Sequence, residues 1–95
     1  MKQYVIGATV PLKAKYWLSG TLTACDTYVI YIEDPSGQLI IDGTTMSTST
    51  TGIFTYDYDS SGSSALGVYK VDAVLTASGH IERPRFEFEL IGAVE

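Results

Sequence analysis

The sequence predicts an all-β domain, and three observations carry that prediction. Apolar and polar residues alternate with a period of two over most of the chain, as in strands that bury one face. No stretch of useful length shows the 3.6-residue period of an amphipathic helix. Turn-forming Gly, Asp, Ser and Pro residues separate the alternating segments of this 95-residue chain. We therefore expect short strands joined by tight turns.

The length and composition predict one domain over residues 1–95. A chain of this size buries only about 60–65% of its unfolded surface, which is enough for a single core. The composition is 45% hydrophobic with seven Tyr, three Phe and one Trp, so it is too apolar for a disordered segment. Because Cys25 is the single cysteine, no intrachain disulfide forms and packing must hold the fold. Cys25 itself is expected to be a partly buried small hydrophobe, with a reactive thiol as the alternative.

Three alternating segments in the first half of the chain are expected to be strands. They span residues 10–16, 21–24 and 28–33, and Lys13 and Lys15 mark the solvent side of the first. The residues expected to face the core are Val10, Leu12, Ala14, Tyr16, Leu22, Ala24, Tyr28, Ile30 and Ile32.

The segment DPSG at residues 34–37 is expected to be a β-turn that joins two strands. Asp34 offers a side-chain acceptor at the first position, and Pro35 sets φ to about −65° at the second. Gly37 occupies the fourth position, where type I turns favour glycine. The segment is therefore interpreted as a corner of the scaffold and not as a catalytic loop.

After this corner, residues 39–41 are expected to resume a strand. The Asp42-Gly43 pair then predicts a reversal of the chain. The polar tract Thr44–Thr51 that follows is expected to be either a weak edge strand or an exposed loop.

Three further strands are expected in the second half, over residues 53–58, 68–76 and 85–90. Pro84 cannot donate to a ladder, so pairing of the last strand should begin at Arg85 or later. Leu66, in the loop before the second of these strands, is expected to tuck under the domain. This gives about seven strands. The inward residues of these three are Phe54, Tyr56, Tyr58, Tyr69, Val71, Ala73, Leu75, Phe86, Phe88 and Leu90.

The stretch LGVYKVDA resembles the G-x-Y-x-C-x-A stretch of immunoglobulin domains. Gly67, Tyr69 and Ala73 match, and Val71 stands where the family has its cysteine. Together with about seven strands, this resemblance implies an immunoglobulin-like antiparallel β-sandwich. It also implies that the Tyr69 hydroxyl donates a hydrogen bond to backbone upstream of it.

A second resemblance covers nearly the whole chain. Four motifs occur in order: G-x-x-V-x-L-x-A from Gly7, D-P-x-G from Asp34, T-G-x-F from Thr51 and L-G-x-Y-x-V from Leu66. Their order resembles β-sandwich domains of the alpha-macroglobulin type, and small stand-alone immunoglobulin-like proteins encoded among virion genes of tailed phages and archaeal viruses. The thioester motif of reactive macroglobulins, C-G-E-Q, is missing around Cys25, so no catalytic chemistry comes with the resemblance.

The charge balance argues against nucleic-acid and membrane partners. Eleven acidic residues oppose six basic ones, and the formal charge of −5 repels phosphate backbones and anionic headgroups. No apolar run approaches the ~20 residues of a membrane helix. Pro11, Lys13 and Lys15 interrupt the apolar N-terminal region, so we expect no signal peptide. We expect synthesis in the cytoplasm, and the resemblance implies incorporation into a virion.

No catalytic constellation is expected, and no cofactor or metal site. His80 is the single histidine, is expected in a hairpin turn, and has no G-x-S-x-G serine to activate. Asp57 and Asp59 share an outward face about 7 Å apart, and they are expected to be solvated charges on an open strand. A calcium site built on these two with Asp34 or Asp42 lacks the ligand spacing of a calcium loop.

Apolar residues on faces that alternation assigns to solvent give the candidate interaction surface. An immunoglobulin-like order places the strands over 28–33, 68–76 and 85–90 in one sheet. Their outward residues then mix apolar side chains with opposite charges, as protein contacts do; ordinary scattered surface apolars are the alternative. Trp17 is a second contact candidate or a lid over one end of the sandwich. The candidate residues are Trp17, Val29, Tyr31, Lys70, Val74 and Arg85.

These observations favour a non-enzymatic protein-interaction or structural module, such as a virion or prophage component. It would assemble with itself or with a protein partner through a sheet face or an edge strand. The alternative is a carbohydrate-binding module, with Trp17, Tyr4 and Tyr31 stacking on sugar rings.

Overall fold

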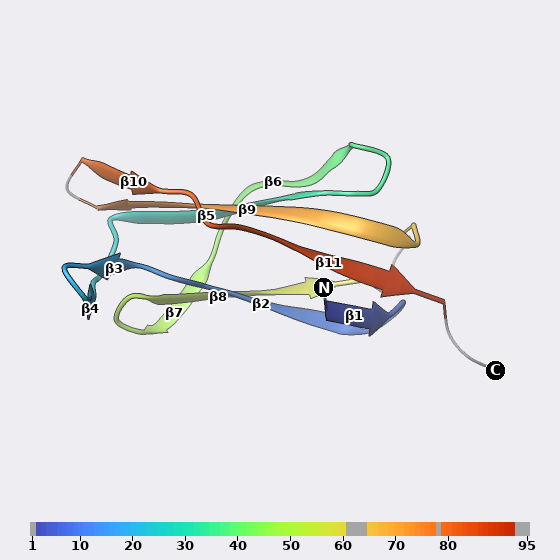
Figure 1. Cartoon of the computed structure of the whole chain (residues 1–95), viewed down its shortest axis with the longest axis horizontal. Coiled ribbons are helices and arrows are strands. Elements are labelled where there is room, and N and C mark those ends of the chain that lie inside the picture. Colours follow the sequence, from blue (N-terminus) through green and yellow to red (C-terminus); the bar gives the residue numbers. More distant parts are fainter. Residues whose placement is uncertain (1, 61–64, 78, 93–95) are drawn as a thin grey trace.

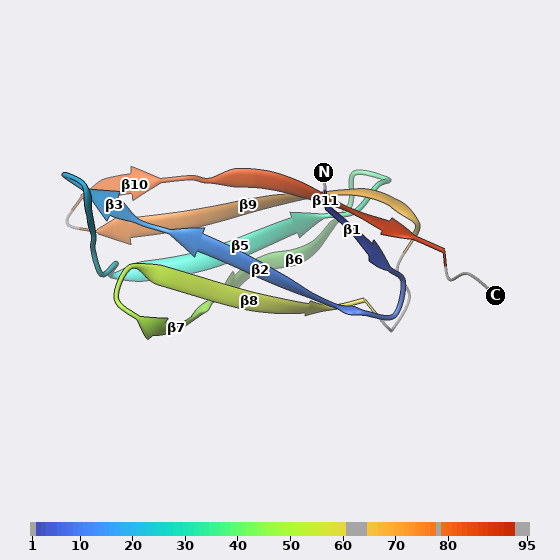
Figure 2. The ribbon, with the colours of Figure 1, turned by 60° about the horizontal axis from the view of Figure 1, so that its bottom comes forward.

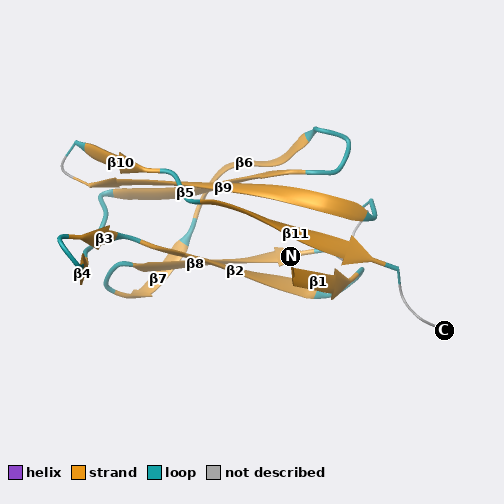
Figure 3. Ribbon diagram, viewed as in Figure 1, coloured by secondary structure: helices purple, strands orange, loops and turns teal. Residues whose placement is uncertain are grey.

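A computed structural model describes residues 2–60, 65–77 and 79–92, which form two stacked layers of strands (Figure 1). Within these ranges every regular element is a strand and no helix occurs (Figure 3). The all-β prediction is therefore confirmed. The strands are β1 (Lys2–Val5), β2 (Thr9–Lys15), β3 (Trp17–Leu18), β4 (Thr21–Leu22), β5 (Thr27–Glu33), β6 (Leu39–Thr45), β7 (Ser47–Thr50), β8 (Ile53–Asp59), β9 (Gly67–Ala77), β10 (His80–Glu82) and β11 (Arg85–Ile91).

One layer is a six-stranded sheet in the order β1-β11-β9-β5-β6, with β10 also paired to β9. All its pairs are antiparallel except β1 with β11, which run parallel. The sheet is therefore mixed, and the expectation of purely antiparallel pairing is wrong at this edge. The chain leaves β1 for the other layer at Gly7, where φ is +96°, so β1 and β2 form no hairpin and β1 pairs with the last strand instead.

The other layer is a three-stranded sheet in the order β2-β8-β7, and β3 and β4 form a separate two-stranded hairpin. The chain crosses from β6 to β7 at Met46, which is buried and donates its backbone N–H to the Tyr28 carbonyl at 2.8 Å. The tract Thr44–Thr51 thus ends one strand and supplies the edge strand β7. Of the two alternatives for this tract, the edge strand is confirmed.

The two layers bury a core that the period-two pattern predicted well. Tyr28 and Phe54 stack across the layers with ring centroids 4.7 Å apart, and Tyr69 stacks on Phe88 at 5.0 Å. Aromatic pairs of this kind add about 0.5–1.5 kcal/mol beyond their buried area. The fully or nearly fully buried apolar residues are Val10, Leu12, Ala14, Tyr16, Ile30, Ile32, Met46, Phe54, Tyr58, Tyr69, Val71, Ala73, Leu75, Ala77, Phe88 and Leu90.

Three local predictions are confirmed. The Tyr69 hydroxyl donates to the Ala65 carbonyl, four residues upstream, at 2.6 Å. The 34–37 corner is closed by a hydrogen bond from the Gly37 N–H to the Asp34 carbonyl at 3.0 Å. The Asp34 carboxylate also accepts from the Ser36 hydroxyl at 2.7 Å and from two backbone N–H groups. As Pro84 predicted, β11 begins at Arg85.

The expected reversal at Asp42-Gly43 is wrong, because both residues lie inside β6. Ile30 pairs with Thr44 and Tyr31 with Asp42, which leaves Gly43 as the extra residue of a β-bulge. Its φ of +77° suits a bulge as well as a turn, since both need a backbone that glycine adopts without strain.

Three smaller expectations are also wrong. Leu66 is 54% exposed and lies near Gly92 at the surface, so it does not tuck under the domain. Ala24 is exposed because pairing of β4 ends at Leu22. The count of about seven strands misses the short strands β1, β3 and β10, which have two to four residues each and are too short to show alternation.

Candidate interaction surface

The outer face of the six-stranded sheet carries the candidate residues in rows that cross the strands. Tyr31 of β5 lies opposite Asp72 of β9, and Asp72 in turn lies opposite Arg85 of β11. We call these residues, with Arg83, the arginine row. One pair further along each strand, Glu33, Lys70 and Glu87 are aligned in the same way. These three form the glutamate row.

A third row lies on the other side of the arginine row, where Val29 of β5 faces Val74 of β9. Both valines are half-buried although they point away from the core. The reason is that β5 and β9 have neighbours on both sides, so adjacent side chains cover their outward residues. This row therefore adds apolar surface beside the charged rows.

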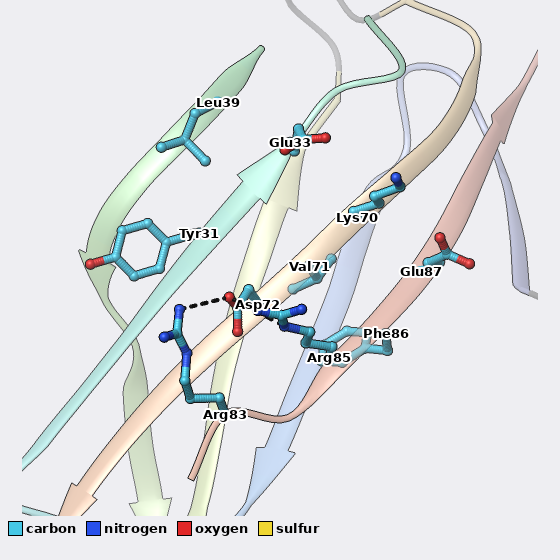
Figure 4. Close-up of a pocket in the computed structure, with 10 residues that line it drawn as sticks. All are labelled: Tyr31, Glu33, Leu39, Lys70, Val71, Asp72, Arg83, Arg85, Phe86 and Glu87. Atoms are coloured by element: carbon cyan, nitrogen blue, oxygen red, sulfur yellow. Dashed lines mark hydrogen bonds and ion pairs between the residues drawn. The ribbon is translucent and has the colours of Figure 1, made fainter. Parts of the chain in front are cut away.

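The arginine and glutamate rows line a hollow of about 600 Å³ on this face. Figure 4 shows the side chains of Arg83, Arg85 and Asp72 grouped at one end, and those of Glu33, Lys70 and Glu87 toward the other. Leu39 and Tyr31 form one wall, from β6 and β5. The lining residues are Tyr31, Glu33, Leu39, Lys70, Val71, Asp72, Arg83, Arg85, Phe86 and Glu87.

Asp72 holds the two arginines in place. Its Oδ2 accepts a hydrogen bond from the Arg83 guanidinium at 3.1 Å and lies 3.6 Å from Nε of Arg85. The Asp72 side chain is 25% exposed, whereas both arginine side chains are more than half exposed. The backbone bond from Ala73 N–H to the Pro84 carbonyl, 3.1 Å, fixes the segment that carries Arg83 beside β9. The guanidinium groups are therefore anchored at one edge and open to solvent at the other.

Tyr31 covers the bulge in β6. A Cβ atom added at Gly43 would lie 3.3 Å from the Tyr31 hydroxyl oxygen and 3.4–3.5 Å from its ring carbons. The ring therefore occupies the space that a side chain at Gly43 would take. This packing gives Tyr31 a defined position on the wall of the hollow.

The structure brings five of the six sequence-predicted contact residues onto this one face: Val29, Tyr31, Lys70, Val74 and Arg85. Trp17 lies elsewhere, on the short hairpin of β3 and β4, where it is 55% exposed beside Leu18. Figures 1 and 2 both place this hairpin at the same end of the molecule as β10. Trp17 is thus separate from the face and does not extend it.

Sequence reasoning missed part of the lining. Alternation does place Glu33 and Glu87 outward, but the sequence does not show that they face Lys70 from both sides. Leu39 was expected only as part of a strand, and a second register irregularity, between Ile32 and Glu33, places it opposite Glu33. Arg83 precedes Pro84 in a connection that no periodicity covers, and only the fold brings it to Asp72.

The other chemistry-bearing residues remain dispersed. Asp57 and His80 are exposed, on β8 and β10. Among the described residues, no group of three or more His, Cys, Asp or Glu side chains lies close enough together to hold a metal ion. Cys25 is half-buried against the core, as expected, and its pKa is raised by burial and, to a smaller extent, by the neighbouring carboxylate of Asp26.

The three aromatics considered for sugar binding do not share a surface. Tyr4 pairs with buried Leu90 and packs edge-on against Phe88 at 6.1 Å, so it points to the core side of the sheet. Tyr31 lies on the outer face, and Trp17 lies on the β3–β4 hairpin. These residues form no common stacking platform.

No protein-family model matches the chain, and no curated protein or solved structure matches it. In the described part of the chain, no helix is long and apolar enough to cross a membrane.

Proposed function

We propose that this protein is a non-enzymatic interaction or structural module that binds a protein partner through the outer face of its six-stranded sheet. The hollow beside Tyr31 carries this proposal. It combines a fixed aromatic wall with exposed arginines, and the half-buried Val29–Val74 row lies on the same face. Tyr and Arg are enriched among the residues that dominate the energy of protein contacts.

An immunoglobulin-like sandwich is the finer fold that we propose. Strands β5, β9 and β11 are neighbours as the C, F and G strands are in that fold, and β2, β8 and β7 follow the order of B, E and D. The hydrogen bond from Tyr69 to the Ala65 carbonyl has the form of a tyrosine corner. Both features support this assignment.

The role that we propose is that of a virion or prophage component, and it rests on the resemblance of four ordered motifs to immunoglobulin-like virion proteins. A small domain with an ordered contact face suits such a role, since repeated structural contacts need a rigid surface more than a reaction centre. The contact chemistry itself does not depend on this assignment.

The test is light scattering on the purified protein, alone and mixed with candidate virus particles. Tyr31→Glu should abolish the association, because it removes the aromatic wall and places a carboxylate between Asp42 and Asp72. Thr55→Glu is the matched control, since it adds the same charge at an outward position of the three-stranded sheet. Thermal unfolding followed by circular dichroism verifies that both variants are folded.

A protein that stays monomeric and joins no particle would contradict the proposal. Equal binding by the wild type and by Tyr31→Glu would also contradict it, by moving the contact elsewhere. A polysaccharide titration covers the carbohydrate alternative, because Trp17 is the single tryptophan and its fluorescence reports directly on that residue. A saturable change with a glycan that persists in Tyr31→Glu would favour sugar binding at the hairpin.

A further inference from the structure

We propose that the occupant of this face is a second copy of the same chain, docked face to face with its strands antiparallel. This inference rests on the proposed function and specifies its partner. It follows from the distribution of charge over the molecule, from the order of the two charged rows, and from the state of the sheet edges.

The hollow is a neutral region on an acidic protein. It contains three of the six basic residues and three of the eleven acidic residues, so its formal charge is zero. The rest of the chain then holds three basic and eight acidic residues and carries the whole charge of −5. Two copies repel one another over most of their surfaces, but this face can approach its own copy without that repulsion.

The charge within the hollow is ordered along the strands. The arginine row holds Arg83, Arg85 and Asp72, a formal charge of +1, and the glutamate row holds Glu33, Lys70 and Glu87, a formal charge of −1. The rows are two residues apart along each strand, or about 7 Å. The face is therefore a dipole whose axis follows the strands.

A two-fold axis that lies in the interface perpendicular to the strands matches this dipole to itself. It places the arginine row of each copy opposite the glutamate row of the other and makes the strands antiparallel. An axis along the strands would instead place like rows together. Closed two-fold dimers use the same patch on both subunits. A single face that carries both the arginine row and the glutamate row is therefore complementary to itself.

The neighbouring apolar residues supply contact area for such a dimer. Tyr31 forms a wall of the hollow, Leu39 is 44% exposed, and the Val29–Val74 row continues the surface. A standard interface buries about 800 Å² on each partner. This is about one seventh of the 5756 Å² of accessible surface of the described chain, a fraction that one face of the larger sheet can supply.

The sheet edges favour contact through a face over pairing of edge strands. The edge strand β2 carries Pro11, Lys13 and Lys15, residues that discourage addition of another strand. Two register irregularities interrupt the pairing of β6 with β5, and such bulges also disfavour a regular ladder. The remaining edge strands among the described residues, β1, β3, β4, β7 and β10, have only two to four residues each.

Charge reversal on β11 provides the test, because Arg85 and Glu87 are both exposed and both point to the hollow. Arg85→Glu changes the formal charge of the face from zero to −2, and Glu87→Arg changes it to +2. In sedimentation equilibrium the wild type should dimerise, and each variant alone should dissociate at least ~10-fold more readily. An equimolar mixture of the two variants should recover a heterodimer of wild-type affinity, because the negative face then meets the positive one.

Matched controls place the same charge changes on the other sheet. Lys13→Glu and Asp57→Arg alter exposed outward residues of β2 and β8, and both should dimerise like the wild type. Increasing salt should weaken the wild-type dimer, since the exposed charges become screened. Circular dichroism verifies the fold of each variant, and the salt series on the wild type tests the proposal even if one variant does not fold.

A wild-type protein that remains monomeric at the highest accessible concentration would overturn the second-copy inference. If that monomer still joined a particle through Tyr31, the proposed function would stand without it. A dimer whose two charge variants fail to pair when mixed would overturn the antiparallel arrangement. Weakening by Lys13→Glu to the same extent as by Arg85→Glu would show that the dimer uses another surface.

Discussion

The outer faces of the two sheets have the same alternating sequence pattern, but their outward residues are buried to different extents. Along β2, at the edge of the three-stranded sheet, every outward residue is exposed. Along β9, in the middle of the six-stranded sheet, four of the five outward residues are half-buried and only Lys70 is exposed. The inward residues of both strands are buried except Gly67 at the start of β9. Outward in sequence therefore does not mean exposed in the structure.

This difference shows that the burial of an outward residue depends on how many strands lie beside it. The central strands β5 and β9 are covered on both sides, and the connection before β11 brings Arg83 over them. The outward side chains of β2 in the small sheet are exposed, whereas the large sheet presents a hollow with walls. For this reason we place the proposed contact surface on the large sheet.

The largest expected change in the free energy of unfolding is at Gly52, beside the small sheet. Gly43 in the large sheet provides the comparison. Gly52, before β8, has φ +79°, and an added Cβ would lie 2.7 Å from the backbone N of Thr23 and 2.8 Å from Cβ of Leu22. Backbone cannot give way, so Gly52→Ala should lower the free energy of unfolding by about 3 kcal/mol or more. Gly43→Ala should cost only about 1 kcal/mol, because its added Cβ meets the movable end of the Tyr31 side chain at 3.3 Å. Urea unfolding of both variants measures the difference, and equal costs would contradict this ranking.

The next effect tests the two outer faces directly. Val74→Ala removes a half-buried side chain that faces Val29, and it should lower the free energy of unfolding by about 1 kcal/mol. Lys13→Ala, at an exposed outward position of β2, should change it by less than about 0.5 kcal/mol. Chemical denaturation of both variants gives the comparison. A Val74→Ala variant as stable as the wild type would mean that the outer face of the large sheet is no better packed than that of the small one.

A smaller effect is expected at the ion pairs of the arginine row. Arg83→Gln removes the 3.1 Å hydrogen bond to Asp72 and should lower the free energy of unfolding by about 0.5 kcal/mol, because partly exposed pairs are screened by water. Arg85→Gln should cost less, since its Nε lies 3.6 Å from the same oxygen. Thermal unfolding of both variants at low and high salt measures these two costs and their dependence on salt. A cost for Arg83→Gln that does not shrink with added salt would contradict an electrostatic origin.

The smallest expected effect is on the pH dependence of stability, and it compares the 34–37 corner of the large sheet with the Thr51-Gly52 corner of the small one. The Ser36 hydroxyl, followed by the Gln38 backbone N–H, holds the pKa of Asp34 below its ordinary value of 3.8. A lowered pKa means that the ionised carboxylate favours the folded state. The contribution of the Asp34 carboxylate to stability is therefore present above pH 3.8. It is lost as the pH falls through the lower pKa that Asp34 has in the folded protein.

Ser36→Ala should raise the pKa of Asp34 toward its ordinary value, as measured by NMR titration of the side-chain carboxyl carbon. The corner of the small sheet, Thr51-Gly52, has no carboxylate, so Thr51→Ala should leave that titration unchanged. An unaltered Asp34 titration in Ser36→Ala would show that the hydroxyl does not stabilise the charge.

Much of the core could be predicted from the sequence, because inward residues follow from the period of two alone. Tyr69, Val71, Ala73 and Leu75 are all buried as expected. Elements that lack a period were not predictable, and the short strands β1, β3 and β10 are the examples. Ser60 is another: it is 1% exposed, and its hydroxyl accepts from the Gly7 N–H and donates to the Ala8 carbonyl in the connection before β2. A serine in a polar loop gives no sign of such a partner more than 50 residues away.

The sequence by itself determined which side of each long strand turns inward, where the 34–37 corner lies and that β11 starts after Pro84. These features depend on side-chain spacing and on backbone preferences within a few residues. Only the tertiary structure decided that Gly43 forms a bulge, that β1 runs parallel to β11, and that Arg83 meets Asp72 beside Tyr31. The physical reason is that strand pairing depends on contacts between residues far apart in the sequence. These contacts minimise the free energy of the whole chain, and no local sequence pattern reports them.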